Sequence, residues 1–103
     1  MDSTENELIQ QAAAGNRQAF GALVQRHQAR VFQFIRRLHG STNEAGDLTQ
    51  ETFIKAYQAL PRWRPEARFH TWLLQMARKT TLGALRQRRR RPEDTLVVHA
   101  QLA

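Results

Sequence analysis

The sequence predicts an all-α fold, a compact bundle of about four helices. Two observations support this fold class: apolar residues recur at spacings of three and four through most of the chain, and no segment alternates in the manner of a β-strand. Gly, Pro and capping residues divide the periodic stretch into four segments. With 103 residues the chain can bury one core of modest size. We therefore expect one helical domain over residues 1–92 and a linker or frayed tail over 93–103.

The first two helices are expected on either side of Gly15. Thr4, as N-cap, and Glu7 match a capping box at the start of the first helix. Gly15 ends this helix, Asn16 can cap the second, and Gly40 stops the second. Apolar residues follow one side of the second helix: Phe20, Leu23, Val24, His27, Val31, Phe34, Ile35 and Leu38. The arginines lie largely off that stripe and are expected to be solvated: Arg26, Arg30, Arg36 and Arg37.

The third helix is expected from about Glu44, after a loop over 41–43, to about Leu60, where Pro61 ends it. At 100° per residue its buried stripe comprises Ala45, Leu48, Thr49, Thr52, Phe53, Ala56, Ala59 and Leu60. The opposite face carries Asp47, Gln50, Glu51, Ile54 and Gln58. An Ile in the middle of a polar face is unusual, although a single exposed Ile is common. This face is therefore either a solvated surface or a docking surface for another helix.

The segment 61–65 is rich in Pro, Arg and aromatic residues and is expected to be a rigid link rather than a helix or strand. The last helix begins near Glu66 or Ala67, and Pro92 closes it. One side of this helix carries Phe69, Trp72, Leu73, Met76, Ala77, Thr80 and Ala84. Other apolar residues lie away from that side: Leu74, Leu82 and Leu85. We therefore expect this helix to contact both the core and a partner.

Charge is distributed unevenly along the chain, whose formal net charge is +7. Residues 1–60 carry six Lys/Arg and six Asp/Glu, and so are neutral overall. Residues 61–92 carry ten Lys/Arg and the single acid Glu66, a balance of +9. Such segregation favours a polyanionic partner, with nucleic acid as the first candidate and an anionic membrane surface as the second.

The composition disfavours catalysis and metal binding. The four histidines are scattered in the sequence, cysteine is absent and the five glycines are isolated, so neither a metal cluster nor a phosphate loop is indicated. No metal, cofactor or enzymatic activity is expected. No apolar run is long enough to span a bilayer, and the acidic N-terminus lacks signal-peptide features. We expect a cytoplasmic protein without membrane insertion.

Cations and aromatic rings alternate around the link between the third and last helices. Phosphate contacts fit Arg62, Arg64 and Arg68, and base stacking fits Trp63, Phe69 and Trp72. Phe69 and Trp72 also fit the core stripe. Both roles are compatible if the rings form a wall against which a splayed base rests.

Three spaced motifs run through the second half of the chain. D-L-x-Q-E-x-F-x-K-A-x-x-A-L begins at Asp47, F-x-T-W-L-x-x-x-A-R begins at Phe69, and L-R-x-R-R-R begins at Leu85. This order resembles region 2 of the bacterial sigma factors, above all the small group-four type, also called extracytoplasmic-function sigma factors. The likeness extends over most of the chain, from the Glu7-Leu8-Ile9 opening to the arginine run.

The resemblance implies two binding surfaces. In the family, the acidic and amide face of the D-L-x-Q-E helix docks on the coiled coil of the RNA polymerase β′ subunit, and the matching residues are Asp47, Gln50, Glu51, Ile54 and Gln58. The loop and the helix after it recognise and help to open the minus-ten promoter element, with a non-template base flipped into the loop. The matching positions are Arg62, Trp63, Arg64, Arg68, Phe69, Thr71, Trp72, Gln75, Lys79 and Arg86. An anti-sigma factor is a further partner that the resemblance implies.

The chain departs from the family's pattern in two residues and in length. Lys79 and Gly83 stand where A-x-N-x-x-x-D-x-L-R has Asn and Asp, which favours a phosphate contact at Lys79 over base readout. Gly83 either weakens the helix or permits close packing. The family's helix-turn-helix domain is not in this sequence, so we expect a piece of a longer protein or a stand-alone region 2 protein. The alternative function is a general basic nucleic-acid-binding or membrane-surface helical module.

Overall fold

The computed structural model describes residues 3–64 and 68–90, and over these ranges it is helical without a strand. The elements are α1 (Ser3–Ala13), α2 (Arg17–His39), α3 (Thr42–Ala59), the 3₁₀ turn η1 (Leu60–Arg62) and α4 (Phe69–Arg90). The predicted all-α bundle of about four helices is confirmed. The expected tail over 93–103 lies outside the described residues. None of the described helices is long and apolar enough to cross a lipid bilayer.

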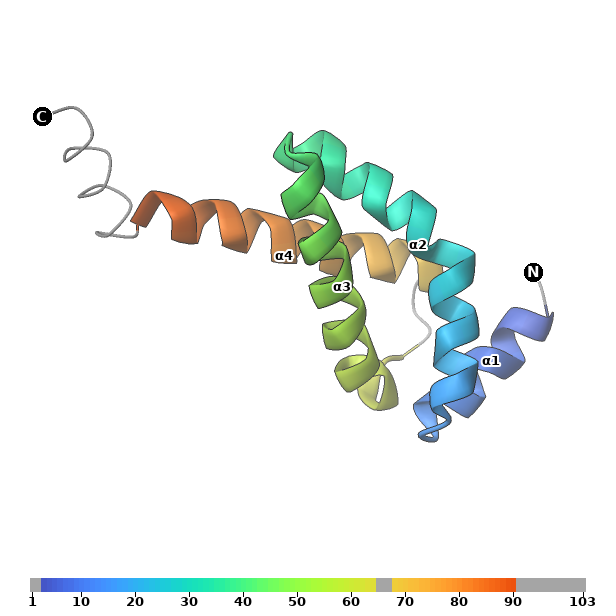
Figure 1. Ribbon diagram of the computed structural model, residues 1–103. Helices are drawn as coiled ribbons and strands as arrows, with labels where there is room; N and C mark the ends of the chain where they lie inside the picture. The colour runs from blue at the N-terminus through green and yellow to red at the C-terminus, as the bar shows by residue number, and fades with distance from the viewer. Residues whose placement is uncertain (1–2, 65–67, 91–103) are drawn as a thin grey trace, which may run out of the picture.

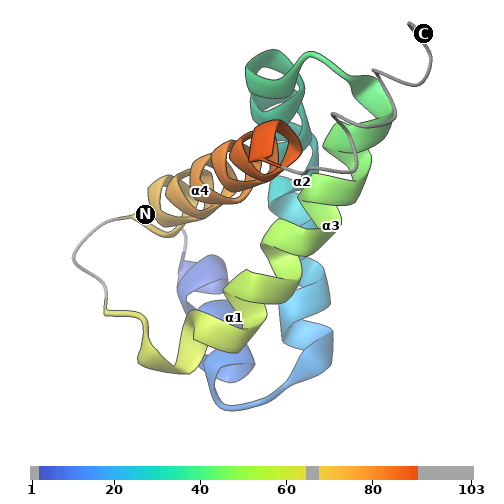
Figure 2. The same ribbon diagram turned by 90° about the vertical axis from the view of Figure 1, so that its left-hand side faces the viewer.

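Helix α2 is the hub of the bundle, since it packs against α1, α3 and α4. Helix α4 runs across α2 and α3 and contacts both, and its C-terminal part extends beyond the bundle (Figure 1). Figure 2 shows α4 almost along its axis, lying against α2 and α3. Helix α1 packs against α2 and also contacts η1, the turn that follows α3.

The core lies where α2, α3 and α4 meet, and small residues let these helices approach closely. Ala45 and Ala56 on α3 and Ala77 on α4 are completely buried. Two fully buried threonines are satisfied within their own helices: Thr52 donates to the Leu48 carbonyl (2.7 Å) and Thr81 to the Ala77 carbonyl (2.8 Å). Because each hydroxyl has a partner, these polar groups carry no unpaired-donor cost in the core.

Several of the predicted helix ends are confirmed. The Asn16 side chain accepts a hydrogen bond from the Ala19 N–H (3.1 Å) and caps α2. Gly15 (φ +106°) and Gly40 (φ +93°) adopt the left-handed conformation that favours glycine. Gly40 therefore ends α2, with its N–H donating to the Arg36 carbonyl (2.8 Å).

Other helix ends differ from the prediction by one or two residues. Helix α1 begins at Ser3, so Thr4 lies inside its first turn and is not the N-cap. Helix α3 begins at Thr42 instead of about Glu44, and its N-cap is Ser41, whose Oγ accepts from the Glu44 N–H (3.3 Å). Both errors arise where consecutive Asp, Ser, Thr or Asn residues compete for the capping position.

The link after α3 is partly helical, contrary to the prediction of a non-helical segment. Pro61 lies inside η1, where its missing N–H leaves no donor unpaired. Helix α4 begins at Phe69 in the described residues, and the Trp72 N–H donates to the Arg68 carbonyl (3.0 Å). The expected start at Glu66 or Ala67 lies outside the described residues.

Candidate polymerase and nucleic-acid interfaces

The predicted polar face of α3 is solvent-exposed throughout. Its members are Asp47, Gln50, Glu51, Ile54 and Gln58. Ile54 is 59% exposed, and among the described residues it is the one large hydrophobic side chain that is exposed to solvent. Glu51 forms an ion pair with Lys55 along the helix (2.9 Å). The predicted division of α3 into a buried and an exposed face is confirmed, with Ala59 only half-buried.

An apolar hollow of about 390 Å³ lies beside Ile54. It is lined by Arg17, Phe20, Phe53, Ile54, Tyr57 and Gln58. The Phe20 ring contacts the rings of Tyr57 (centroids 4.8 Å apart) and Phe53 (6.4 Å). Sequence reasoning missed Tyr57, because the hollow forms only where α2 and α3 pack together. A hollow next to an exposed Ile is a place where a partner side chain can be buried.

Three aromatic rings from either side of residues 65–67 meet at the start of α4. The centroids of Trp63, Phe69 and Trp72 are 5.6–5.8 Å apart in all three pairs. Phe69 is buried, whereas the two tryptophans are half-buried. We refer to these three residues as the aromatic cluster. The predicted core position of Phe69 is confirmed, and the half-buried tryptophans keep ring surface exposed to solvent, whereas base stacking stays a prediction.

Exposed cations and polar groups surround the aromatic cluster. Arg62, Arg64 and Arg68 are exposed on the link, and Thr71, Gln75 and Lys79 are exposed at intervals of four along α4. Arg86 is also exposed, but it lies about 25 Å along the helix axis from Phe69 at 1.5 Å per residue. Most of the predicted DNA-facing residues therefore lie on the link and the first half of α4, and Arg86 lies farther along the helix, where it lines one hollow together with Lys79.

A second hollow, of about 340 Å³, joins the two predicted surfaces. It is lined by Glu51 and Lys55 of α3 and by Lys79, Thr80, Gly83, Ala84, Arg86 and Gln87 of α4. A Cβ atom added at Gly83 would meet nothing within 4 Å. The prediction that this glycine permits close packing is therefore wrong, since no neighbour approaches it.

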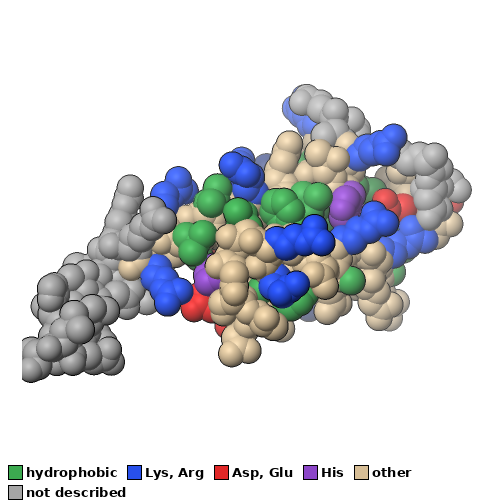
Figure 3. Space-filling view, turned by 90° about the horizontal axis from the view of Figure 1, so that it is seen from above, with side chains coloured by type: hydrophobic (Ala, Val, Ile, Leu, Met, Phe, Trp, Pro, Cys, Tyr) green, Lys and Arg blue, Asp and Glu red, His purple; other side chains and the backbone are tan. Residues whose placement is uncertain are grey.

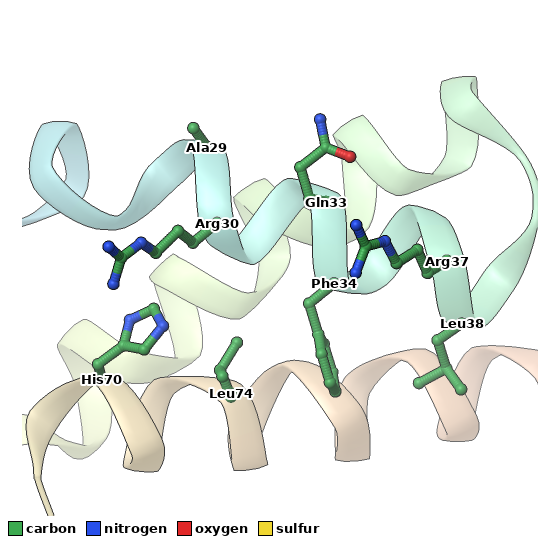
Figure 4. A pocket seen from close by; sticks show the side chains of 8 residues that line it. All are labelled: Ala29, Arg30, Gln33, Phe34, Arg37, Leu38, His70 and Leu74. Atoms are coloured by element: carbon green, nitrogen blue, oxygen red, sulfur yellow. The ribbon is translucent and has the colours of Figure 1, made fainter.

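A third hollow, of about 630 Å³, lies between α2 and α4 (Figure 4). Its floor is apolar, with Phe34 and Leu38 from α2 and Leu74 from α4, and Arg30 and Arg37 stand at its edge. Figure 3 shows hydrophobic side chains gathered on the surface seen from above, with Lys and Arg side chains around them. The predicted solvent exposure of the arginines is confirmed, and Leu74 is half-buried against α2.

Two histidines that lie far apart in the sequence are in contact in the structure. His27 Nδ1 lies 3.0 Å from His70 Nδ1, and His27 Nε2 lies 2.7 Å from Glu5 Oε1. The contact depends on how α2 and α4 cross, because the two residues are 43 positions apart. No group of three or more His, Cys, Asp or Glu side chains within the described residues could hold a metal ion.

Comparison with known proteins identifies the family. Residues 23–91 match the family model of sigma-70 region 2. The RNA polymerase sigma-H factor of Pseudomonas aeruginosa is 37% identical over 91 residues, which cover 88% of this chain and 47% of that protein. The ECF RNA polymerase sigma-E factor of Haemophilus influenzae is 37% identical over 100 residues, which cover 95% and 52%. The chain thus spans about half the length of these relatives.

Two solved structures share the fold. An engineered region 2 of sigmaE in complex with GTAAAA superposes with a TM-score of 0.79 at 34% identity, covering 86% of this chain and 93% of that chain. CnrH in complex with the cytosolic domain of CnrY gives a TM-score of 0.71 at 32% identity, covering 78% and 52%. The family match, the relatives and the shared fold agree, and the chain belongs to the sigma-70 region 2 family.

Proposed function

We propose that the chain is the region 2 domain of an extracytoplasmic-function sigma factor. In this role it binds the β′ subunit of core RNA polymerase through α3 and the minus-ten promoter element through the start of α4. The observation that carries the proposal is the presence of two unlike surfaces on one bundle: an exposed Ile in a polar face, and an aromatic cluster among arginines. The chain spans about half the length of its relatives, so the proposal concerns region 2 and not the activity of a whole sigma factor.

The α3 surface has the composition of a helix-docking site. Ile54 supplies an apolar anchor, and the neighbouring hollow can accept an apolar side chain of a facing helix. Asp47, Gln50 and Glu51 surround the anchor with carboxylate and amide groups that set orientation through a polar rim. The resemblance gives the facing element as the β′ coiled coil.

The α4 surface suits single-stranded DNA rather than duplex. The half-buried faces of Trp63 and Trp72 can stack on bases that have left the duplex, and the exposed arginines can contact the backbone. Stacking a flipped base offsets the few kcal/mol that unstacking costs, so capture of the non-template strand would favour the open promoter. A region 2 of sigmaE at 34% identity has been solved with GTAAAA, which supports this assignment.

The same surfaces would also be targets for inhibition. CnrH, which shares the fold, has been solved with the cytosolic domain of CnrY. By analogy, and from the family resemblance, we propose an anti-sigma factor as a partner that competes for these surfaces. The alternative of a general basic module is favoured instead if duplex and single strands of any sequence bind equally well.

Ile54→Asp tests the polymerase surface. We expect the variant to lose at least tenfold in affinity for the isolated β′ coiled coil, because a buried carboxylate would replace the apolar anchor. Stability should change by no more than about 0.5 kcal/mol, because the side chain is mostly exposed. Binding can be measured by calorimetry and folding by circular dichroism.

Gln25→Asp is the matched control for this experiment. It introduces the same charge at an exposed position of α2, away from the α3 face, and should leave binding to the β′ coiled coil unchanged. The polymerase assignment is wrong if folded Ile54→Asp binds as tightly as the parent.

A further inference from the structure

A chain of hydrogen-bonded titratable groups joins α1, α2 and α4 at the point where α4 begins. It runs from Glu5 Oε1 to His27 Nε2 (2.7 Å) and from His27 Nδ1 to His70 Nδ1 (3.0 Å). The ring centroids of the two histidines are 5.1 Å apart, and the ring planes differ by 25°. The centroids are farther apart than the two Nδ1 atoms by almost twice the distance from a ring nitrogen to its own ring centre. The two Nδ1 atoms therefore point toward each other. The 3.0 Å separation of the two nitrogens is that of a hydrogen bond.

A hydrogen bond between two imidazole nitrogens holds one proton. When both rings are neutral, His27 gives its Nε2–H to Glu5 and accepts at Nδ1 the N–H of His70. When His27 is charged, it donates from both nitrogens and His70 accepts. In either case His70 is neutral. If both rings are charged, two N–H groups face each other and the hydrogen bond is lost.

The surroundings oppose a charge on His70. Burial lowers the pKa of His70, with further lowering by His27 and Arg30 and a smaller opposite effect of Glu5. Figure 4 shows the Arg30 side chain reaching from α2 toward the His70 ring. Arg26, also on α2, lies 3.6 Å from Glu5 and competes for its carboxylate. These are the charged groups that α1, α2 and α4 direct at the histidine pair in the described residues.

The histidine pair is in direct contact with the aromatic cluster. The His27 ring packs edge-on against Phe69, with centroids 5.3 Å apart, and Phe69 contacts both tryptophans. His70 directly follows Phe69 in the first turn of α4. A break between the two histidines would therefore release the turn of α4 that positions the rings of the cluster.

We propose that Glu5, His27 and His70 form an acid-sensitive positioning relay for the DNA-facing surface. The intact relay holds the first turn of α4 on α2 and keeps the aromatic cluster in place. Protonation of both histidines breaks the relay and loosens the cluster. Because the pKa of His70 is lowered by folding, the stabilisation is complete above the ordinary histidine value and is lost as the pH falls below it. Acidification would thus weaken capture of single-stranded DNA, an inference that rests on the proposed function.

The relay can be tested first without DNA. The chain has two tryptophans, Trp63 and Trp72, and both are in the cluster, so intrinsic fluorescence reports on it directly. Between about pH 8 and about pH 5 we expect a fluorescence transition with a midpoint below that of a free histidine. His70→Gln should abolish the transition. Glu5→Gln should shift its midpoint to lower pH, because removal of the carboxylate makes the second charge harder to accept.

His39→Gln is the matched control. His39 also pairs with a carboxylate, that of Glu44 (2.8 Å), but this pair joins α2 to α3 and not to the first turn of α4. This variant should keep the parent transition. The relay is overturned if His70→Gln retains the parent transition. If that variant does not fold, an unshifted midpoint in Glu5→Gln overturns it instead.

The link to DNA is tested with a labelled single-stranded oligonucleotide containing GTAAAA. Below the midpoint, the parent should lose up to about tenfold in affinity per pH unit, in proportion to the fraction with an intact relay. His70→Gln should hold or gain affinity on acidification, because added positive charge alone strengthens DNA binding. Parallel losses in parent and His70→Gln overturn the link. Absence of parent binding at neutral pH contradicts the proposed function, and the fluorescence test still decides the relay.

Discussion

Lys79 and Trp63 should contribute to DNA binding in different ways. Both belong to the proposed DNA surface, but Lys79 is an exposed cation on α4 whereas Trp63 is a half-buried ring of the cluster. Lys79→Ala should weaken binding to all single strands alike and reduce the slope of log K against log salt by about 0.7–1. Trp63→Ala should cost about 1–3 kcal/mol for each base that it stacks, and leave the slope unchanged.

Fluorescence anisotropy over a salt series distinguishes these effects. Gln28→Ala, at an exposed position of α2, is a suitable control that should alter neither quantity. A sequence-dependent loss in Lys79→Ala would contradict the phosphate assignment. It would mean that the lysine reads a base in place of the asparagine that the family pattern has there.

For single residues, the sequence predicts exposure to solvent more reliably than contacts with residues of other helices. Periodicity was sufficient to separate Ile54 from the buried stripe of α3, because one helix determines both faces. It could also assign His27 to the apolar side of α2. It could not reveal the contact of His27 with His70, because that contact depends on the crossing of α2 and α4 and on the Glu5 carboxylate from a third helix.

Two glycines of helices α2 and α4 should respond oppositely to substitution by Ala. Gly83 lies within α4 with open space at its Cβ position, so Gly83→Ala should stabilise the fold by up to about 1 kcal/mol. Gly40 has φ +93° at the end of α2, so Gly40→Ala should destabilise by about 1 kcal/mol. Urea unfolding followed by circular dichroism measures both. Destabilisation by Gly83→Ala would show that the glycine is needed for a contact of α4.

The elements follow from the sequence more reliably than their ends do. Four helices were predicted because each has a stripe at helical period and because Gly15, Gly40 and Pro61 separate them. Their first residues were less certain, since runs such as Ser41 to Asn43 offer several equivalent caps. The hollows beside Ile54 and between α2 and α4 could not be predicted, because each requires side chains from two packed helices.

At the scale of the whole molecule, DNA binding should depend more on where the positive charges lie than on the net charge. Two double variants can be compared: Arg62→Gln/Arg64→Gln and Arg36→Gln/Arg37→Gln. Each double variant lacks two exposed positive charges of the parent, so the two proteins have the same net charge. The first pair flanks Trp63 of the aromatic cluster, whereas the second pair lies at the end of α2. If single-stranded DNA follows the cluster, the first double variant should reduce the salt slope by about 1.4 and the second should leave it nearly unchanged.

This comparison also separates the sigma-factor function from the general basic module. A long-range attraction between a cation and a polyanion would lose the same amount in both double variants, because each has the same net charge. A defined strand path requires the loss to be confined to the arginines beside the aromatic cluster, with preference for single strands over duplex. Equal salt slopes in the two double variants would therefore favour the basic module, even if both still bind DNA.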